Sequence, residues 1–571
     1  MSVIEPQIGG RRARLCQLHA LAPFTANLLF LALAGAPSAR ANVYATNIKL
    51  YDSAATPPPL ASVSPANPAL LLPGRSLKMD YLLNDDATVG VVVEIFYGTN
   101  VLRTISLPPG NPGTVRGANS ILWDGTDDQG SNAALGTYSV RITAAASGYG
   151  GWTQFSDDFN AGNYVFEPRG LAVNQNTNSP YYGRVFVGNA FEGTDPGRNP
   201  GDKVGLQKLN ADGSSAEEGI FSDGGWPWAG NTLSPWKMEV SEDDYLYVAD
   251  RASNGLVLRF NQTISPASRL MVLRNDNRPG GGSAKLNGPF ITGAGTNSQI
   301  WMADVNPTNR VGIRRWNVAA GGALATNDWG LTVVQADGGS DLDACPYDVA
   351  VDKDGRIYVV QNALDAGLPE PNSKILRFPA NPSGATPLTN ADWKLSGAGA
   401  FPGAFGIAVD STGTYVAVAQ RGVSANNHTG AALTVLATTN GGTVTTLAAG
   451  SSYDHVDVAW DNVGNLYGLD NFSSRWRAYS PPGANAATTI ALQSVRVGNT
   501  VAPPTLSAPA WSGGQFQFTL IGQANASYII ETSTNLQNWV AVLTNSSIEA
   551  TRPITLAAPD SESCYRALVG P

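Results

Sequence analysis

The chain of 571 residues is poor in cysteine and histidine, with three of each. Beyond the first 41 residues only Cys345 and Cys564 remain, far apart, so a disulfide between them is open but is not implied by the spacing. Only His428 and His455 remain there as well, which excludes a zinc site built on three histidines.

Charged residues are also scarce, at 14% of the chain, and the 45 acidic residues outnumber the 36 basic ones, which gives a formal net charge of −9. An acidic chain without a basic stripe does not suit nucleic-acid binding. No long segment has the helical period, which excludes a helical rod. A hydrophobic content of 43% provides enough apolar side chains for packed cores and excludes intrinsic disorder.

Residues 1–41 have the pattern of an export signal. Basic residues precede an apolar stretch, Leu28–Ala36, and the small residues Ala39 and Ala41 predict cleavage before Asn42. The apolar stretch is too short for a membrane span, which takes about 20 residues. We therefore expect an exported protein that is released, held at the cell surface or periplasmic, with no transmembrane segment after signal removal.

The rest of the chain alternates short runs rich in Val, Ile, Tyr and Thr with Gly, Pro, Asn and Asp, which predicts an all-β fold. Three regions can be distinguished: 42–147, 150–500 and 502–571. The last reads as a small sandwich and is similar to a C-terminal module that is common on large secreted bacterial proteins.

The region 42–147 has runs of alternating apolar and polar residues, typical of an antiparallel sandwich. Its string Trp123–Gly130 (WDGTDDQG), followed by Gly-Thr-Tyr at 136–138, resembles the Ig-like module of the flagellar hook-capping protein FlgD over residues 81–145. The resemblance implies an Ig-like β-sandwich. Three carboxylates in this string either cap the turn or bind calcium: Asp124, Asp127 and Asp128.

The region 150–500 contains six copies of one pattern, a strand, a tight polar turn and a second strand. In four copies the second strand ends 15 residues after a common anchor. The anchors and ends are Pro235 and Asp250, Pro289 and Asp304, Pro346 and Gln361, and His455 and Asp470. Two further copies begin at Pro168 and Ala404.

Such a unit cannot bury both faces alone, but six units arranged radially pack against one another and expose only short edges. The repeats therefore predict a six-bladed β-propeller. Their pattern, P-x-G-(I/L)-A-V-D followed by D-G-x-(I/L)-Y-V-x-D, resembles the NHL-repeat propellers over residues 168–479. The expected fold is all-β: a six-bladed propeller flanked by two small Ig-like or sandwich domains.

In a propeller, the loop that enters the first strand of a blade and the loop that leaves its second strand open on the same face. The residues after the anchors should therefore form one ring: Arg169, Trp236, Lys237, Phe290, Tyr347, Phe405, Asp454 and His455. The second-strand ends should form a neighbouring ring: Asn189, Asp250, Asp304, Gln361, Gln420 and Asp470.

Three carboxylates of the second ring, Asp250, Asp304 and Asp470, are candidate metal ligands. Carboxylates around one mouth repel one another, and a calcium ion would relieve this because calcium takes oxygen ligands. The alternative is that each aspartate caps its own loop by accepting bonds from backbone N–H groups.

The candidate binding residues are aromatic or basic. Trp226, Trp228 and Trp236 lie within 11 residues and could form a stacking platform for sugar rings, although packing between blades explains them as well. Arg169 and Tyr347, from the first ring, complete the candidate binding set.

Propeller enzymes offer a second interpretation. Gluconolactonase-type propellers hold a metal with Glu, Asn and Asp at first-strand starts; Glu167 could serve, but Tyr347 stands where the Asp is expected. For a lyase, His455 could act as a base oriented by Asp454 or Asp457, although a lone histidine at a strand start is often structural.

We therefore expect a non-enzymatic binding or scaffold protein that binds a protein or a glycan through the loop face of the propeller. The alternative is a metal-dependent hydrolase, lactonase or lyase acting in the channel mouth. The enzyme needs a convergent polar pocket with a bound ion and His455 beside a carboxylate, whereas the binding protein needs an exposed aromatic or apolar patch.

Overall fold

The computed structural model describes residues 43–569 with gaps, so the predicted signal segment 1–41 and Cys345 lie outside the described residues. The positions left out within this range are 73, 196–197, 230–233, 253–255, 275–284, 306–311, 319–321, 323, 325–327, 329, 337, 343–345, 363–372, 397–400, 425, 499–503, 513–514, 523–526, 535–537, 546–550 and 558–563.

The first domain is a sandwich of two sheets. One sheet has the order β1-β3-β6, from β1 (Ala45–Asp52), β3 (Leu77–Leu83) and β6 (Gly117–Trp123). The other contains β2 (Ala69–Leu71), β4 (Gly90–Tyr97), β5 (Asn100–Leu107) and β7 (Gly136–Tyr149), and the short 3-10 turn η1 (Leu60–Ser62) precedes β2. Buried residues alternate along β3, so its apolar side chains face a core that also buries Trp123 and Tyr138.

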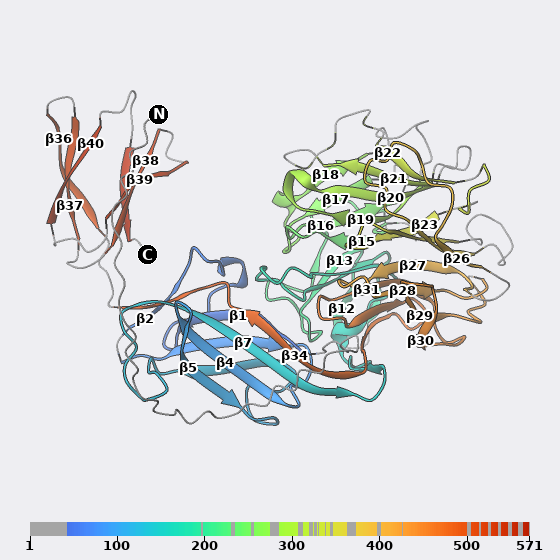
Figure 1. Ribbon diagram of the computed structural model, residues 1–571, viewed down its shortest axis with the longest axis horizontal. Coiled ribbons are helices and arrows are strands. Elements are labelled where there is room, and N and C mark those ends of the chain that lie inside the picture. The colour runs from blue at the N-terminus through green and yellow to red at the C-terminus, as the bar shows by residue number, and fades with distance from the viewer. Residues whose placement is uncertain are drawn as a thin grey trace, which may run out of the picture. The chain divides into compact units, whose positions relative to one another are not determined.

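Strands from far along the chain complete this sandwich. β34 (Gly483–Ile490) pairs with β7, and β35 (Val495–Val497) lies between β2 and β7, so the orange colour of the late chain appears among blue and cyan strands (Figure 1). From the sequence alone, residues 483–497 were expected in the propeller region 150–500. In the structure the chain leaves the sandwich after β7, builds the propeller and returns at β34, so the propeller is an insertion in the sandwich.

Six four-stranded sheets occupy the inserted region of the described chain, and we call them blades 1 to 6. Blade 1 is β9 (Pro168–Val173), β10 (Val185–Asn189), β13 (Gly205–Leu209) and β14 (Phe221–Ser222). Blade 2 is β15 (Met238–Val240), β16 (Leu246–Asp250), β17 (Leu256–Phe260) and β18 (Leu270–Leu273). Blade 3 is β19 (Lys285–Thr292), β20 (Gln299–Val305), β21 (Gly312–Asn317) and β22 (Leu331–Gln335).

Blade 4 is β23 (Pro346–Val351), β24 (Ile357–Gln361), β25 (Lys374–Phe378) and β26 (Trp393–Ser396). Blade 5 is β27 (Ala404–Val409), β28 (Tyr415–Gln420), β29 (Ala432–Ala437) and β30 (Thr443–Leu447). Blade 6 is β31 (His455–Trp460), β32 (Leu466–Asp470), β33 (Arg475–Ser480) and β8 (Thr153–Gln154). The remaining elements are β11 (Gly193–Asp195), β12 (Arg198–Asp202), η2 (Ala161–Asn163), η3 (Pro266–Ser268) and η4 (Gly295–Asn297).

The blades close into a ring. Their innermost strands contact one another in the cycle β9, β15, β19, β23, β27, β31 and back to β9. The outer strand of blade 6 is β8, which precedes blade 1 in the chain and pairs with β33. Segments from both ends of the inserted region therefore share one sheet, which ties the ring shut.

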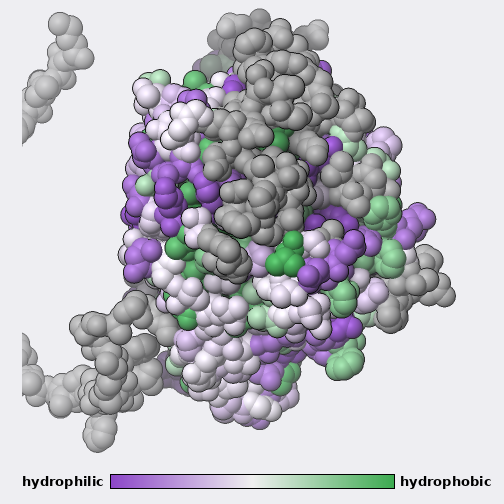
Figure 2. Space-filling model, turned by 90° about the vertical axis from the view of Figure 1, so that its right-hand side faces the viewer, coloured by the Kyte–Doolittle hydropathy of each residue, from purple (hydrophilic) through white to green (hydrophobic). Residues whose placement is uncertain are grey.

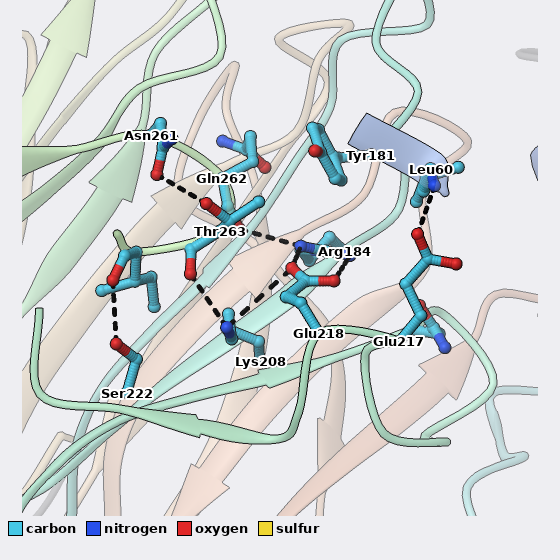
Figure 3. Close-up of polar contacts among 12 residues, drawn as sticks. Leu60, Tyr181, Arg184, Lys208, Glu217, Glu218, Ser222, Asn261, Gln262 and Thr263 are labelled. Carbon is cyan, nitrogen blue, oxygen red and sulfur yellow. Dashed lines mark hydrogen bonds and ion pairs between the residues drawn. The ribbon is translucent and has the colours of Figure 1, made fainter. Parts of the chain in front are cut away.

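Buried charges connect blades 1 and 2 on their outer side (Figure 3). Arg184, only 1% exposed, forms an ion pair with Glu218 and donates to the carbonyl oxygen of Gln262 at 2.8 Å. The Nζ of Lys208 donates to the carbonyl oxygen of Thr263 at 2.9 Å. Because these charges have partners inside the protein, we interpret the cluster as part of the packing between blades.

The C-terminal domain has two three-stranded sheets, in the orders β36-β37-β40 and β39-β38-β41. The strands are β36 (Thr505–Ser512), β37 (Gln515–Ile521), β38 (Tyr528–Ser533), β39 (Val540–Asn545), β40 (Thr551–Ala557) and β41 (Cys564–Val569). Its core includes Phe518, Tyr528 and Ile530, and Cys564 is an exposed free thiol. The predicted all-β fold with a propeller and flanking sandwiches is confirmed. None of the described residues belongs to a helix that is long and apolar enough to cross a membrane.

Candidate functional site

A buried ion cluster lies where the innermost strands of the blades meet. The ammonium group of Lys237 in blade 2 bonds to Asp348 of blade 4 at 3.0 Å and to Asp457 of blade 6 at 2.7 Å. Its third bond goes to the carbonyl oxygen of Val456 at 3.2 Å, so all three N–H donors are used. We call Lys237, Asp348 and Asp457 the central trio.

The two carboxylates of the trio are also satisfied by backbone groups of other blades. Asp348 accepts from the N–H of Ile407 in blade 5 at 3.1 Å, and Asp457 accepts from the N–H of Leu171 in blade 1 at 2.8 Å. Burial raises the pKa of both carboxyls, although Lys237 opposes this, and the two carboxylates raise the pKa of Lys237 despite its burial. The trio therefore links most of the ring through complete hydrogen bonding.

Glycines of the other three blades make room for the trio. A Cβ on Gly170 would lie 2.2 Å from the carbonyl oxygen of Trp236, and one on Gly288 would lie 1.8 Å from an Asp348 oxygen. A Cβ on Gly406 would meet Asp457 at 2.9 Å. Charged residues in blades 2, 4 and 6 thus face glycines in blades 1, 3 and 5, and the ring packs tightly at this level.

A cavity of about 680 Å³ opens on the face formed by the turns between first and second strands. It is lined by turn residues of every blade, among them Asn176, Glu242, Gln299, Asp354, Ser411 and Asn462. This is the opposite face of the ring from the one that the sequence analysis proposed. The wall also includes Phe290, Trp301 and Arg315 of blade 3 and Glu239 of blade 2.

Glu239 occupies a position that is apolar in the other blades. It pairs with Tyr247, which lies three residues before Asp250, the predicted end of the second strand. The residues with the same pairing position are Ala172, Phe290, Ala350, Ala408 and Ala459. Burial, followed by the nearby charges of Asp457 and Asp348, raises the pKa of Glu239 well above its ordinary value. The acid therefore stands beside the central trio at the inner part of the cavity wall.

Other carboxylates of the cavity wall are engaged by their own turns. Asp352 accepts from the N–H groups of Asp354 and Arg356, both at 2.9 Å. Asp410 accepts from the N–H groups of Thr414 and Tyr415, both at 2.7 Å. These two carboxylates fix the turns rather than face a ligand.

The basic groups of the wall are engaged as well. Lys353 and Asp354 form an ion pair at 2.9 Å. The guanidinium of Arg315 lies over the ring of Trp301 and donates to the carbonyl oxygens of Asn381 and Pro382. Within the described chain, no hydrogen-bond or ion-pair partner from another side chain is found for Glu239.

The structure brings several members of the predicted first ring together. Tyr347 and Phe405 stack with ring centroids 4.3 Å apart, and Trp236 meets both at about 6 Å. The guanidinium of Arg251 lies 4.5 Å from the Trp236 ring centroid and donates to the Tyr347 hydroxyl at 3.0 Å. Trp236, Tyr347 and Phe405 are almost fully buried, so this cluster packs the ring beside the trio.

Arg169 and Asp454 belong to a second group of contacts on that side. Arg169 donates to Glu167 at 2.8 Å and to Asn471, and burial lowers its pKa. Asp454 accepts two bonds from Arg421, at 2.6 and 2.8 Å; burial alone would raise its pKa, but Arg421 holds it below the ordinary value. Arg169 is 7% exposed, so it offers little surface to a ligand.

The three candidate metal ligands are not gathered into one site. Asp250 accepts from the N–H of Ala252 at 3.0 Å and from the Trp226 indole N–H at 2.9 Å. Asp470 accepts from the N–H of Phe472 and from Arg477, and Asp304 lies 4.0 Å from Arg314 of its own blade. Across the residues that the structure describes, no group of three or more His, Cys, Asp or Glu side chains is arranged to hold a metal.

The three tryptophans of the predicted platform are also separated in their packing. Trp226 and Trp228 pack against the core between blades 1 and 2, where Trp228 meets Phe260, whereas Trp236 is buried beside Tyr347. The face drawn in Figure 2 shows hydrophobic residues scattered among hydrophilic ones rather than one continuous apolar patch among its coloured atoms.

His455 is 1% exposed and its Nε2 lies 2.9 Å from the carbonyl oxygen of Ala448. Its ring stacks on Tyr453, and burial lowers its pKa. The histidine thus has a backbone partner and an aromatic neighbour, as expected for a structural residue.

Sequence reasoning missed Glu239 and the roles of Asp348 and Lys237. The signal for Glu239 was present in the repeat, because KMEV at 237–240 has Glu where GLAV, DVAV, GIAV and DVAW have Ala. The signal for the central trio lay two positions before Glu239, where each copy of the repeat has either a glycine or a charged residue.

Residues 72–148 match the family model of the FlgD Ig-like domain, in agreement with the sequence-based resemblance. No curated protein matches the chain significantly.

Solved structures share low sequence identity with the chain. A structural-genomics protein of unknown function from Bacteroides thetaiotaomicron is 10% identical with a TM-score of 0.35, over 73% of this chain and 96% of that one. The soluble aldose sugar dehydrogenase of Escherichia coli in its apo form is 11% identical with a TM-score of 0.38, over 58% and 99%. A Trichoderma reesei carbohydrate-active enzyme of family AA12 is 12% identical with a TM-score of 0.35, over 59% and 97%.

Proposed function

We propose that this is an exported, non-enzymatic binding protein that holds a glycan in the cavity on the turn face of its propeller. The observation that carries the proposal is the cavity itself, of about 680 Å³, which all six blades line. Cavities of roughly 300–1,000 Å³ accommodate ligands of a few rings.

The residues that line the cavity suit a ligand that is rich in hydroxyl groups. Amide and hydroxyl side chains line the cavity, among them Asn176, Gln299, Ser411 and Asn462. Asn176, Gln299 and Ser411 donate hydrogen bonds within the protein, and their oxygen atoms can still accept from sugar hydroxyls. Phe290 supplies an aromatic, partly buried wall that can lie against the apolar face of a sugar ring. A concave site of this size favours a glycan over the flat surface of a protein partner.

The contacts of His455 favour binding over the alternative of a metal-dependent hydrolase, lactonase or lyase. A general base needs a free nitrogen within hydrogen-bond reach of its substrate. The Nε2 of His455 bonds to a backbone carbonyl, and its Nδ1, which has no hydrogen-bond partner, is buried with the ring against Tyr453, out of reach of a substrate.

The proposal also includes three features that come from the sequence alone. The NHL type of the six repeats, the export signal and a location outside the cell or at its surface rest on sequence patterns. In this proposal the FlgD-type sandwich and the C-terminal module act as spacers or docking units for the propeller.

Isothermal titration with three trisaccharides tests the proposal: cellotriose, tri-N-acetylchitotriose and the fully deacetylated chitotriose. We expect binding of at least one, and loss of that binding in Ser411→Trp, which places a large side chain at an exposed rim position. Ser106→Trp, on exposed β5 of the sandwich, is the matched control and should bind like the wild type. Absence of binding to all three sugars, or an unchanged affinity in Ser411→Trp, contradicts the proposal; capture of a protein partner in place of a sugar does so as well.

A further inference from the structure

Glu239 breaks the repeat at a partly buried position of the cavity wall. Four of the six blades have alanine at the equivalent position, and blade 3 has Phe290. Ala172 and Ala350 are at most 1% exposed, Ala459 is 7% exposed and Ala408 is partly buried, so a small apolar side chain suffices for the fold there. A carboxyl group at this position has to be explained by something other than packing.

Partial burial of this carboxylate costs free energy unless a partner compensates it. Its strand neighbour Lys237 is fully used by Asp348, Asp457 and a carbonyl oxygen. The other cations of the wall, Arg315 and Lys353, bond to carbonyl oxygens and to Asp354. Among the described groups around the cavity, none supplies a cation to Glu239.

The surroundings of Glu239 are also negative overall. The central trio has two carboxylates for one ammonium group. The cavity wall has five acidic residues, Glu239, Glu242, Asp352, Asp354 and Asp410, against two basic ones, Arg315 and Lys353, and acids remain in excess when Arg356, which pairs with Asp352 and Asp354, is counted as well. A concave site with an excess of one sign concentrates the potential and attracts the opposite charge.

We propose that the cavity takes a ligand with a primary ammonium group, an amino sugar of the glycan proposed above, and that Glu239 is the carboxylate that pairs with it. This inference rests on the proposed function and specifies the chemical class of the ligand. An ammonium group donates three hydrogen bonds, one to Glu239 and the others to nearby oxygens. A metal ion would need several oxygen ligands converging on one point, which the described acids do not provide.

Binding should be linked to a proton. Because burial and the nearby carboxylates raise the pKa of Glu239, a proton competes with the cation for this carboxylate at a higher pH than for an ordinary glutamate. Affinity should therefore increase as pH rises through the titration of Glu239, as long as the amine stays charged. The groups that face Glu239 and titrate with it are Asp348 and Asp457 on β23 and β31, with Lys237 on its own strand.

The test compares two matched ligands, chitotriose and tri-N-acetylchitotriose, which differ in charge but share a backbone. The wild type should bind chitotriose about tenfold to hundredfold more tightly at pH 6.5, the range of one charge-assisted hydrogen bond. Glu239→Gln should lose this preference and release fewer protons on binding, measured by titration in two buffers of different ionisation enthalpy. Glu94→Gln on the sandwich removes the same charge elsewhere and should retain both.

The outcomes separate this inference from the proposed function. Equal binding of both sugars, unchanged in Glu239→Gln, overturns the ammonium site but leaves glycan binding in place. Binding to neither sugar nor to cellotriose overturns both. Tight binding of calcium alone that Glu239→Gln abolishes overturns the ammonium site in favour of a metal.

Discussion

Two acidic positions near the centre of the ring have opposite relations to their neighbours. The carboxylates of Asp348 and Asp457 are buried but fully bonded, to Lys237 and to backbone N–H groups of blades 5 and 1. Glu239 is two residues from Lys237 on the same innermost strand, and the other blades have alanine or phenylalanine at its level. The bonded acids Asp348 and Asp457 hold the blades together, whereas Glu239 has no side-chain partner among the described residues.

The comparison shows how the repeat distinguishes residues that stabilise the fold from residues that serve a ligand. A buried polar group with all its partners stabilises a defined packing, and its loss is felt by the whole ring. A partly buried acid without a side-chain partner contributes little to the packing, so its presence points to a ligand. The repeat makes this distinction possible, because the other blades show which residue the fold needs at the position of Glu239.

The largest effect should come from removing the cation of the central trio. Lys237→Met leaves two buried carboxylates without their counter-charge, which we expect to lower the free energy of unfolding by about 3–5 kcal/mol. Denaturant unfolding measures it. Adding Asp348→Asn and Asp457→Asn should recover part of the loss, and a decrease below about 1 kcal/mol in the single variant contradicts the structural role.

A smaller effect should come from filling the space beside the trio. In Gly170→Ala the new Cβ would lie 2.2 Å from the carbonyl oxygen of Trp236 and 2.8 Å from Cα of Lys237. Because backbone atoms have to move, we expect a loss of about 1–3 kcal/mol in unfolding free energy. Gly151→Ala, with no atom within 4 Å of the added Cβ, is the matched control and should be neutral. Equal stability of the two variants would show that the ring is loosely packed at this level.

The stability contribution of Asp457 and the sugar affinity at Glu239 should change with pH in opposite directions. Burial raises the pKa of Asp457, so the folded state binds its proton more tightly than the unfolded chain does. Its contribution to stability is present below about pH 4 and is lost as pH rises through the folded pKa of about 6, whereas sugar affinity at Glu239 increases with pH. The difference between wild type and Asp457→Asn in chemical unfolding at several pH values measures the first effect. Asp128→Asn on the exposed turn is the control, and identical pH profiles for wild type and Asp457→Asn contradict the assignment.

Much of the fold could be predicted because the repeat fixes local structure. The predicted ends Asn189, Asp250, Gln361, Gln420 and Asp470 are the last residues of β10, β16, β24, β28 and β32. Regular alternation and turn residues determine such strands locally. The pairing of β8 with β33 and of β34 with β7 depends instead on contacts between distant segments, which no local pattern encodes.

The site was harder to predict than the fold. The sequence analysis correctly brought Trp236, Tyr347 and Phe405 together, but their burial makes them part of the packing. The cavity lies on the opposite face because the space between blades depends on side-chain volumes around the whole ring. Glu239 itself was visible in the sequence as a departure from the alanine of the other copies.

The most direct test measures stability and affinity together in Glu239→Ala, which gives blade 2 the residue that four other blades already have. The account predicts a free energy of unfolding at neutral pH equal to or higher than that of the wild type, with affinity for chitotriose reduced about tenfold or more. A variant that is clearly destabilised while it binds chitotriose as tightly as the wild type would show that Glu239 serves the fold and not a ligand.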